Sequence, residues 1–167
     1  PVAEARIDAL VGLDLHSQNP FLAAPTHWNT NSHGEIEHIA PFADGVGLEE
    51  DTPRPLPELL EIALHAICQW QVLEDAGLAH GDIAPSNLLI SSDGASHWID
   101  FDGMRFPDPD IPVPETIGHR SMLAPELRNG SSSPDILSDR FAMTVYLNWL
   151  LLSRHPVTGL ADTPAET

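Results

Sequence analysis

Two short apolar runs separated by a polar loop constrain the fold of this chain more than any other feature. Residues 88–90 read Leu-Leu-Ile, residues 97–99 read His-Trp-Ile, and Asp93-Gly94 lies between them. An Asp-Gly pair between apolar runs is typical of a β-hairpin turn. The pattern therefore predicts an antiparallel hairpin in which residue 90 pairs with 97, 89 with 98 and 88 with 99.

Three oxygen-bearing side chains lie beside this predicted hairpin. In the predicted register Asn87 faces Asp100 at the open end, and Asp82 precedes Asn87 in a loop that contains Pro85, so that all three can line one cavity. Mg²⁺ takes oxygen ligands, usually one or two protein groups together with substrate phosphates and waters. Asn87 and Asp100 fit that role, which leaves Asp82 to accept a proton from an incoming hydroxyl group. Asp and Asn are also common turn residues, so a purely structural role is the alternative for each.

The order of these residues resembles that of the protein-kinase-like fold. Kinases read His-Arg-Asp-x-x-x-x-Asn and then Asp-Phe-Gly, whereas this chain reads His-Gly-Asp at 80–82, Asn87, and Asp-Phe-Asp at 100–102. Residues 118–126 end in Ala-Pro-Glu, as a kinase activation segment does, and an apolar helical run is then followed by Arg-His-Pro at 154–156. The landmarks follow one another with family-like gaps, and the resemblance covers about residues 36–160 well.

The resemblance implies an α+β, protein kinase-like fold, mostly the helical large lobe with a remnant of the small lobe. Residues 1–45 would be the small-lobe remnant, with a helix, strands and the hinge between lobes. Residues 46–167 would be the large lobe, with catalytic loop, metal loop, activation segment and central helix, incomplete at its C-terminus. Because kinases have two lobes, we expect a chain that is truncated at both ends and inactive in isolation.

The resemblance also implies the chemistry. The expected activity is transfer of the γ-phosphoryl group of ATP to serine or threonine hydroxyls of a protein substrate, with Mg²⁺ as the metal. Asp82 would be the catalytic residue, and Asn87 and Asp100 would bind the metal. The residues expected to contact the nucleotide are Ala40 at the gatekeeper position, Ala43 in the hinge and Leu89 beneath the adenine.

Several positions depart from the family pattern and keep two alternatives open. The sequence contains no lysine, Ala84 stands where serine/threonine kinases usually have one, and Gly81 replaces the arginine that would bind a phosphorylated activation loop. Asp102 replaces the metal-loop glycine, and His119 replaces a threonine. These changes favour a catalytically weak or dead pseudokinase scaffold as the first alternative. His-Gly-Asp at 80–82 also resembles small-molecule phosphotransferases of the aminoglycoside and choline kinase type, which is the second.

The composition limits the classes of binding partner and the cellular compartment that this chain suits. The 25 acidic residues outnumber the 7 basic ones, for a net charge of −18, which argues against nucleic acid or anionic membrane as a partner. The single cysteine, Cys68, excludes an internal disulfide, is expected to be a buried small apolar residue, and suits a reducing compartment such as the cytoplasm. The sequence contains no run of 18 apolar residues, which is the length that would predict a membrane-spanning helix.

Hydrophobic periodicity predicts the remaining elements. Helices are expected over residues 3–13, over 57–76 with Gly77 as a C-terminal stop, and from 135 or 138 to 153 with apolar residues on most sides. Strands are expected around 21–23 and over 35–40, and a proline-rich extended surface loop over 103–123.

Three polar side chains on these elements have predicted roles. His65 is expected to be a packed or surface histidine, and the resemblance to kinases implies that His80 is a structural anchor that hydrogen-bonds to the backbone. Asp139 is expected to cap the last helix or, as the resemblance to kinases implies, to reach back and brace the catalytic loop.

Overall fold

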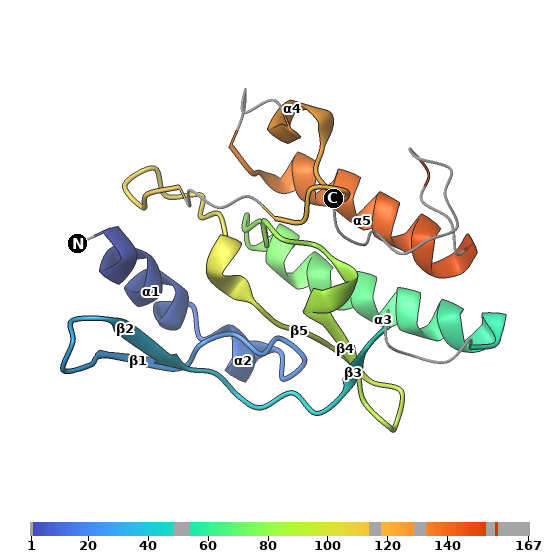
Figure 1. Cartoon of the computed structure of the whole chain (residues 1–167), viewed down its shortest axis with the longest axis horizontal. Helices are drawn as coiled ribbons and strands as arrows, with labels where there is room; N and C mark the ends of the chain where they lie inside the picture. Colours follow the sequence, from blue (N-terminus) through green and yellow to red (C-terminus); the bar gives the residue numbers. More distant parts are fainter. Residues whose placement is uncertain (1, 49–53, 114–117, 129–132, 153–155, 157–167) are drawn as a thin grey trace.

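The computed structural model describes residues 2–48, 54–113, 118–128, 133–152 and 156, which form a mixed α+β structure. Two long helices, α3 (Leu56–Asp75) and α5 (Ile136–Leu152), lie side by side on one flank of a small sheet (Figure 1). Among the described residues, no helix is long and apolar enough to cross a membrane.

Helix α3 confirms the periodic pattern and the predicted stop. Ile62, Ala66, Trp70 and Leu73 are buried along one stripe. The helix ends in a Schellman motif, in which the Gly77 N–H donates to Glu74 O at 2.9 Å and the Leu78 N–H to Leu73 O at 2.9 Å. Gly77 has φ +73°, a left-handed conformation that glycine adopts without steric cost. The chain is thereby turned toward His80.

Helix α5 is buried on most sides, as its width of apolar surface predicts. Val145, Tyr146, Trp149 and Leu150 are buried, whereas Leu152 is 66% exposed because it is the last residue of the helix. Its N-terminus is capped by Asp135 and Ser138 rather than by Asp139. The Ser138 N–H donates to Asp135 Oδ1 and the Asp135 N–H to Ser138 Oγ, both at 2.8 Å.

The central sheet has the order β3 (Val46–Gly47), β4 (Leu88–Ile90) and β5 (Ser96–Trp98), all antiparallel. The predicted hairpin is present, but the predicted register was wrong by one position. Leu88 pairs with Trp98, Leu89 with His97 and Ile90 with Ser96.

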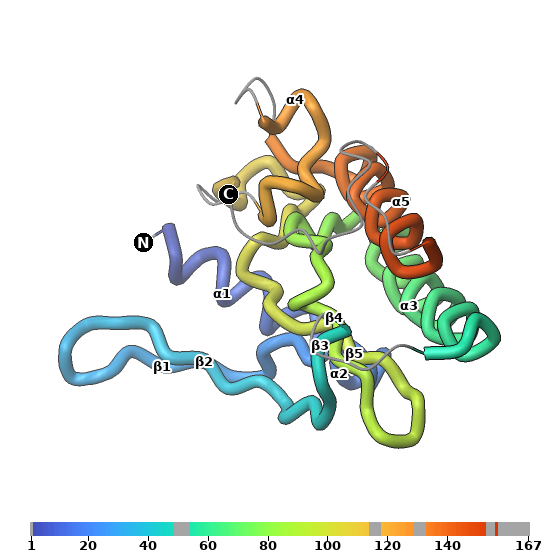
Figure 2. The backbone as a smooth tube through the Cα atoms, turned by 45° about the vertical axis from the view of Figure 1, so that its right-hand side comes forward, coloured from blue at the N-terminus to red at the C-terminus, as the bar shows by residue number. Residues whose placement is uncertain are grey.

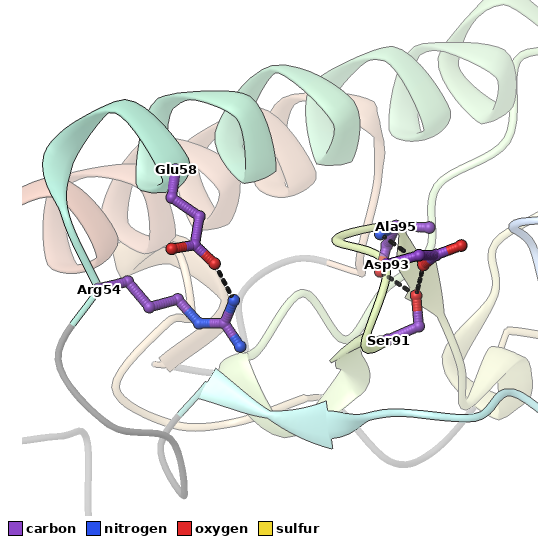
Figure 3. A network of polar contacts seen from close by, with 5 residues as sticks. All are labelled: Arg54, Glu58, Ser91, Asp93 and Ala95. Atoms are coloured by element: carbon purple, nitrogen blue, oxygen red, sulfur yellow. Dashed lines mark hydrogen bonds and ion pairs between the residues drawn. The ribbon is translucent and has the colours of Figure 1, made fainter.

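Hydrogen bonds within the hairpin loop account for the shift. The Ser91 N–H donates to Ala95 O at 2.9 Å, and Asp93 accepts from the Ser91 hydroxyl and from the Ala95 N–H (Figure 3). The strands consequently close around five loop residues instead of six, and Asn87 lies opposite Ile99 rather than Asp100.

Residues 2–39, which precede the central sheet in the sequence, form a separate layer around the N-terminal helix. Helix α1 (Val2–Gly12) is confirmed, and the short helix α2 (Leu15–Gln18) follows it. The predicted strand over 35–40 is β2 (Ile36–Ile39), paired with β1 (His27–Thr30), a segment for which no strand was predicted. This hairpin extends away from the helical body in both views (Figures 1 and 2).

The two layers meet at Trp98. The expected strand around 21–23 is a single parallel bridge between Leu22 and Trp98. Trp98 is fully buried, and its indole N–H donates to Ala66 O at 3.1 Å. One expectation about the core was wrong: Cys68 is exposed, because its position on α3 faces away from the stripe that packs inward.

The proline-rich segment follows the expected irregular course as far as it is described. Residues 107–110 are exposed and form neither helix nor strand. The segment is nonetheless anchored at its start, where Met104 and Phe106 are buried and Arg105 forms an antiparallel bridge with Ala79. Pro114, Arg154 and His155, which also contributed to the sequence pattern, lie outside the described residues.

Candidate active site

His80 is the anchor of the loop between α3 and β4. It is fully buried between the rings of Trp98 and Phe101, at centroid distances of 5.6 and 4.9 Å. Its Nδ1 accepts the Asp82 N–H at 3.3 Å, so Nε2 carries the proton and donates to Ile99 O at 3.1 Å. The predicted structural role, a histidine bonded to backbone, is confirmed.

Asp139 braces the same loop from helix α5. One carboxylate oxygen accepts the His80 N–H at 2.6 Å and the Trp70 indole N–H at 3.3 Å, and the other accepts the Gly81 N–H at 3.0 Å. Asp139 is 2% exposed, and this burial raises the pKa of its carboxyl, although His80 and the three N–H donors oppose the shift. Bracing, rather than helix capping, is therefore the role of Asp139.

Asp82 lies at the centre of the site and is held at both its backbone and its side chain. Asn87 Nδ2 donates to Asp82 O at 3.0 Å, and the His119 N–H donates to Asp82 Oδ1 at 2.9 Å. A Cβ at Gly118 would lie 2.6 Å from the same Oδ1, so only glycine allows the 118–119 backbone to approach this closely. One carboxylate oxygen of Asp82 is thus occupied by the chain itself.

Asn87 and Asp100 both lie at the open end of the β4–β5 hairpin, Asn87 just before β4 and Asp100 two residues after β5. Asn87 is 6% exposed, ends the short 3₁₀ helix η2 (Pro85–Asn87), and its O accepts the Ile99 N–H at 3.0 Å. Asp100 follows directly, is exposed, and has a left-handed backbone with φ 62° before the 3₁₀ helix η3 (Phe101–Gly103). The amide nitrogen of Asn87 donates to Asp82 O, and its Oδ1 accepts the Ser86 hydroxyl at 3.3 Å and has a second lone pair that suits a cation.

A cleft of about 670 Å³ opens between helix α1, strand β2 and the loop that follows β5. Its lining includes Asp82, Asp100, Asp102, Arg6 and Phe101. Two of the three predicted oxygen-bearing residues, Asp82 and Asp100, therefore share this cavity. Asn87 is not among the lining residues. The walls from α1 and η3 are largely apolar, which suits a ligand that combines a ring with a charged tail.

The residues expected to contact the nucleotide lie outside this cleft. Ala40 is exposed just after β2, and Ala43 is half-buried in the irregular stretch before β3. Leu89 is half-buried in β4, where it pairs with Gly47 and His97. Within the described parts of the chain, no three His, Cys, Asp or Glu side chains form a ready metal cluster. The donor set present, a carboxylate and an amide oxygen, fits an oxygen-preferring ion that completes its shell with phosphate and water.

Arg6 is a residue of the site that sequence reasoning missed. Its guanidinium reaches from α1 to the backbone after η3 and lies 5.9 Å from the Phe106 ring. Burial lowers the pKa of Arg6, and the neighbouring Asp102 carboxylate partly offsets the effect. No sequence signal distinguishes this arginine from a solvated charge on an amphipathic helix.

Comparison with known proteins identifies serine/threonine kinases as relatives. The chain is 29% identical over 143 residues to the serine/threonine-protein kinase PknB of Mycobacterium leprae, covering 81% of this chain and 22% of the relative. It is 27% identical over 149 residues to the probable serine/threonine-protein kinase PknB of Lactococcus lactis, covering 83% and 23%. It is 24% identical over 155 residues to the DNA damage-responsive serine/threonine-protein kinase RqkA of Deinococcus radiodurans, covering 91% and 21%.

The chain spans about a fifth of the length of these relatives. No family model matches the chain.

Proposed function

Because the chain belongs to the protein kinase-like superfamily, we propose that it forms the large lobe and part of the small lobe of a serine/threonine protein kinase. In this proposal residues 1–45 are the small-lobe part and residues 46–167 the large lobe. The parent protein transfers the γ-phosphoryl group of ATP to a serine or threonine hydroxyl of a protein substrate.

Each site residue has a role in this proposal. Asp82 orients the acceptor hydroxyl and takes its proton through the carboxylate oxygen that His119 leaves free. Asn87 and Asp100 hold Mg²⁺, which when bound neutralises charge on the transferred phosphate. Ala40 and Ala43 contact the adenine from the hinge side, and Leu89 lies beneath it. Because none of these three residues lines the cleft, the nucleotide in this proposal extends from the hinge to the three oxygen-bearing residues.

The observation that carries the proposal is the brace from Asp139. A buried carboxylate on α5 binds the backbone of His80 and Gly81, and the residue that follows is Asp82. A loop held this rigidly from outside the cleft keeps one carboxylate aimed at a reacting group, which is what positioning catalysis requires. A turn aspartate with only a structural role would not need this support.

A phosphotransfer assay on the full-length parent tests the proposal. With MgATP and a serine-containing protein acceptor, we expect Asp82→Ala and Asp100→Ala each to reduce turnover by at least about a hundredfold. Asp75→Ala is the control, because Asp75 is an exposed carboxylate at the end of α3 and is not among the residues that line the cleft. Wild-type turnover in Asp100→Ala would refute the metal assignment.

A pseudokinase is the second candidate, favoured by one contact in particular. The His119 N–H already occupies Asp82 Oδ1, and Ala84 offers no cation to the phosphate. A scaffold of this kind binds nucleotide but transfers nothing, so nucleotide binding without turnover on protein or on small hydroxyl acceptors would identify it. Turnover on aminoglycoside or choline alone would instead favour a small-molecule phosphotransferase.

A further inference from the structure

One guanidinium joins helix α1 to the chain that follows Asp100. Arg6 donates to Asp102 O and to Met104 O, both at 2.9 Å, and to Pro112 O at 2.6 Å. These oxygens belong to the end of η3 and to the proline-rich segment beyond it. Within the described parts of the chain, none of the three accepts a backbone N–H, so Arg6 is their donor.

The physical chemistry of these acceptors explains why an arginine is needed. The last carbonyls of a short helix point outward without partners and attract a cation. Proline-rich chain offers few N–H groups to satisfy them, since proline has none. A guanidinium presents five N–H donors in a fixed planar fork, so a single side chain can bind carbonyls from both ends of the segment.

We infer that Arg6 is a positioning residue that clamps the segment 102–112 to helix α1 and thereby fixes the backbone at Asp100. Asp100 immediately precedes η3, and its left-handed φ of 62° is held by the two elements on either side of it. On the hairpin side Ile99 is bonded to Asn87 O, and on the other side Arg6 holds η3 at its C-terminal end. Movement of α1 is therefore transmitted to Asp100 through main-chain oxygens.

The three hydrogen bonds of this clamp involve no side chain of the segment and no phosphate group. All three acceptors are backbone oxygens, so their binding to Arg6 depends on the course of the chain and not on its residue types. Gly81 leaves no arginine next to Asp82 to bind a phosphorylated loop, and Arg6 provides a fixed cationic contact from a different element. The consequence for metal binding at Asp100 rests on the proposed function, whereas the clamp itself does not.

Hydrogen exchange of the full chain, in wild type and in two substitutions of Arg6, tests the clamp. The reporter amides are Met104, bonded to Phe101 O at 3.1 Å, and Arg105, bonded to Ala79 O at 2.8 Å. We expect Arg6→Gln to accelerate exchange at Met104 about tenfold or more, because local opening no longer breaks the Arg6 contacts. The exchange rate at Met104 in Arg6→Lys should fall between those of wild type and Arg6→Gln, since an ammonium group keeps the charge but not the planar fork of donors.

Two control variants separate the clamp from general effects of charge and packing. Arg140→Gln removes an equal charge from an exposed arginine that pairs with Glu74, and should leave Met104 exchange unchanged. Pro112→Ala keeps the carbonyl that Arg6 binds and should also resemble wild type. Exchange at the amides of α3 reports whether each variant is folded. If Arg6→Gln does not fold, the exchange rate at Met104 in Arg6→Lys tests the clamp instead. Wild-type exchange in both Arg6 variants, or equal acceleration in Arg140→Gln, would overturn the clamp.

A Mg²⁺ titration, with the metal alone and exchange at residues 100–105 as the signal, tests the link to Asp100. We expect the Mg²⁺ midpoint to rise several-fold in Arg6→Gln and to recover partly in Arg6→Lys, which a merely structural arginine would not produce. If wild type does not respond to Mg²⁺ while Arg6→Gln still accelerates exchange, the clamp stands and the metal site of the proposed function fails. Equal Mg²⁺ midpoints in all variants would refute transmission to Asp100.

Discussion

At the scale of single residues, the site is organised by buried polar groups that bind backbone rather than substrate. Asp139 and His80 together accept or donate five hydrogen bonds around the loop 80–82. Both side chains are at least 98% buried, and buried groups of this kind are retained in a fold only when their bonds are satisfied. Their replacement should therefore destabilise the protein as well as displace Asp82.

Asp139→Asn tests the brace with a nearly isosteric change. One carboxylate oxygen becomes an NH₂ group that faces an N–H donor, so at least one buried backbone N–H loses its acceptor. We expect a loss of roughly 1–3 kcal/mol in the free energy of unfolding, measured by urea titration. Asp75→Asn makes the same charge change on an exposed carboxylate and should cost less than about 0.5 kcal/mol. Equal losses in the two variants would mean that Asp139 does not brace the loop.

His65 links stability to pH. Burial, together with the neighbouring His97, lowers the pKa of His65, while Asp93 opposes the shift. Its Nδ1 accepts the Ser96 N–H at 3.1 Å, a bond that requires the unprotonated nitrogen. A histidine whose pKa is lowered in the folded state is protonated more readily in the unfolded chain. The stability that His65 contributes to the fold is therefore fully present above about pH 6.5, and it is lost as the pH falls toward the pKa of the folded state.

We therefore expect wild type to lose stability below about pH 6.5 relative to His65→Gln, whose side chain has no proton to gain. The measurement is the difference in unfolding free energy between the two proteins from about pH 7.5 down to about pH 5.5, on either side of the ordinary histidine pKa. Taking the difference removes the effect of the histidines that do not interact with His65, which are the same in both proteins. A stability difference between wild type and His65→Gln that stays constant over this pH range would contradict the link.

At the scale of elements, two glycines with left-handed backbone differ in how closely another loop approaches them. Gly81 has φ +80°, and a Cβ there would overlap the carbonyl oxygen of Gly103, where the loop 80–82 crosses the chain after Asp100. Gly34, in the β1–β2 turn, has nearly the same φ of +81°, but a Cβ added there would have no atom within 4 Å. The pair separates the cost of a left-handed backbone from the cost of crowding.

Gly34→Ala should cost about 1 kcal/mol from the left-handed backbone alone. Gly81→Ala should cost roughly 3 kcal/mol, because the backbone of residue 103 must also move away. Chemical unfolding of the two variants measures the difference directly, and spectra of the folded protein would show whether Phe101 shifts with Gly103. Equal costs would mean that the two loops are not in firm contact at this point.

The elements also show where sequence reasoning succeeds and where it stops. Helix α3 was predicted within one residue at each end, because its apolar stripe and its C′ glycine are both local signals. Strand β1 was missed, because His-Trp-Asn-Thr at 27–30 has no alternating pattern and becomes a strand only through its pairing with β2. The hairpin register was wrong by one, since Asp-Gly indicates a turn but does not reveal that Asp93 accepts the Ala95 N–H.

The residues of the candidate site likewise divide into those that the sequence predicts and those that only the structure reveals. Asp82, Asn87 and Asp100 could be selected from spacing and residue type, and the structure lines one cleft with the two aspartates. The role of Asp139 was one of two predicted alternatives, and only its contacts with His80 and Gly81 distinguish them. Arg6 could not be found, because it lies about a hundred residues from its acceptors and binds backbone atoms that carry no sequence signal.

At the scale of the whole molecule, charge is the dominant feature, and local contacts do little to neutralise it. A net charge of −18 is carried by 167 residues without a single lysine. Among the described residues, Arg54 and Arg140 form ion pairs with Glu58 and Glu74, the first visible in Figure 3. Because 7 arginines cannot neutralise 25 carboxylates, most carboxylates repel one another, and this repulsion favours the expanded unfolded chain over the compact fold.

Salt should stabilise the protein for this reason. Between about 0.02 and 0.5 M NaCl the Debye length shortens from roughly 20 Å to under about 5 Å, which screens repulsion across the surface. We expect the thermal midpoint to rise by several degrees over this range. Glu61→Gln, which removes one exposed charge on α3, should raise the midpoint at low salt and have almost no effect at high salt. A midpoint independent of salt, with Glu61→Gln equally silent throughout, would mean that charge repulsion is as strong in the unfolded chain as in the fold.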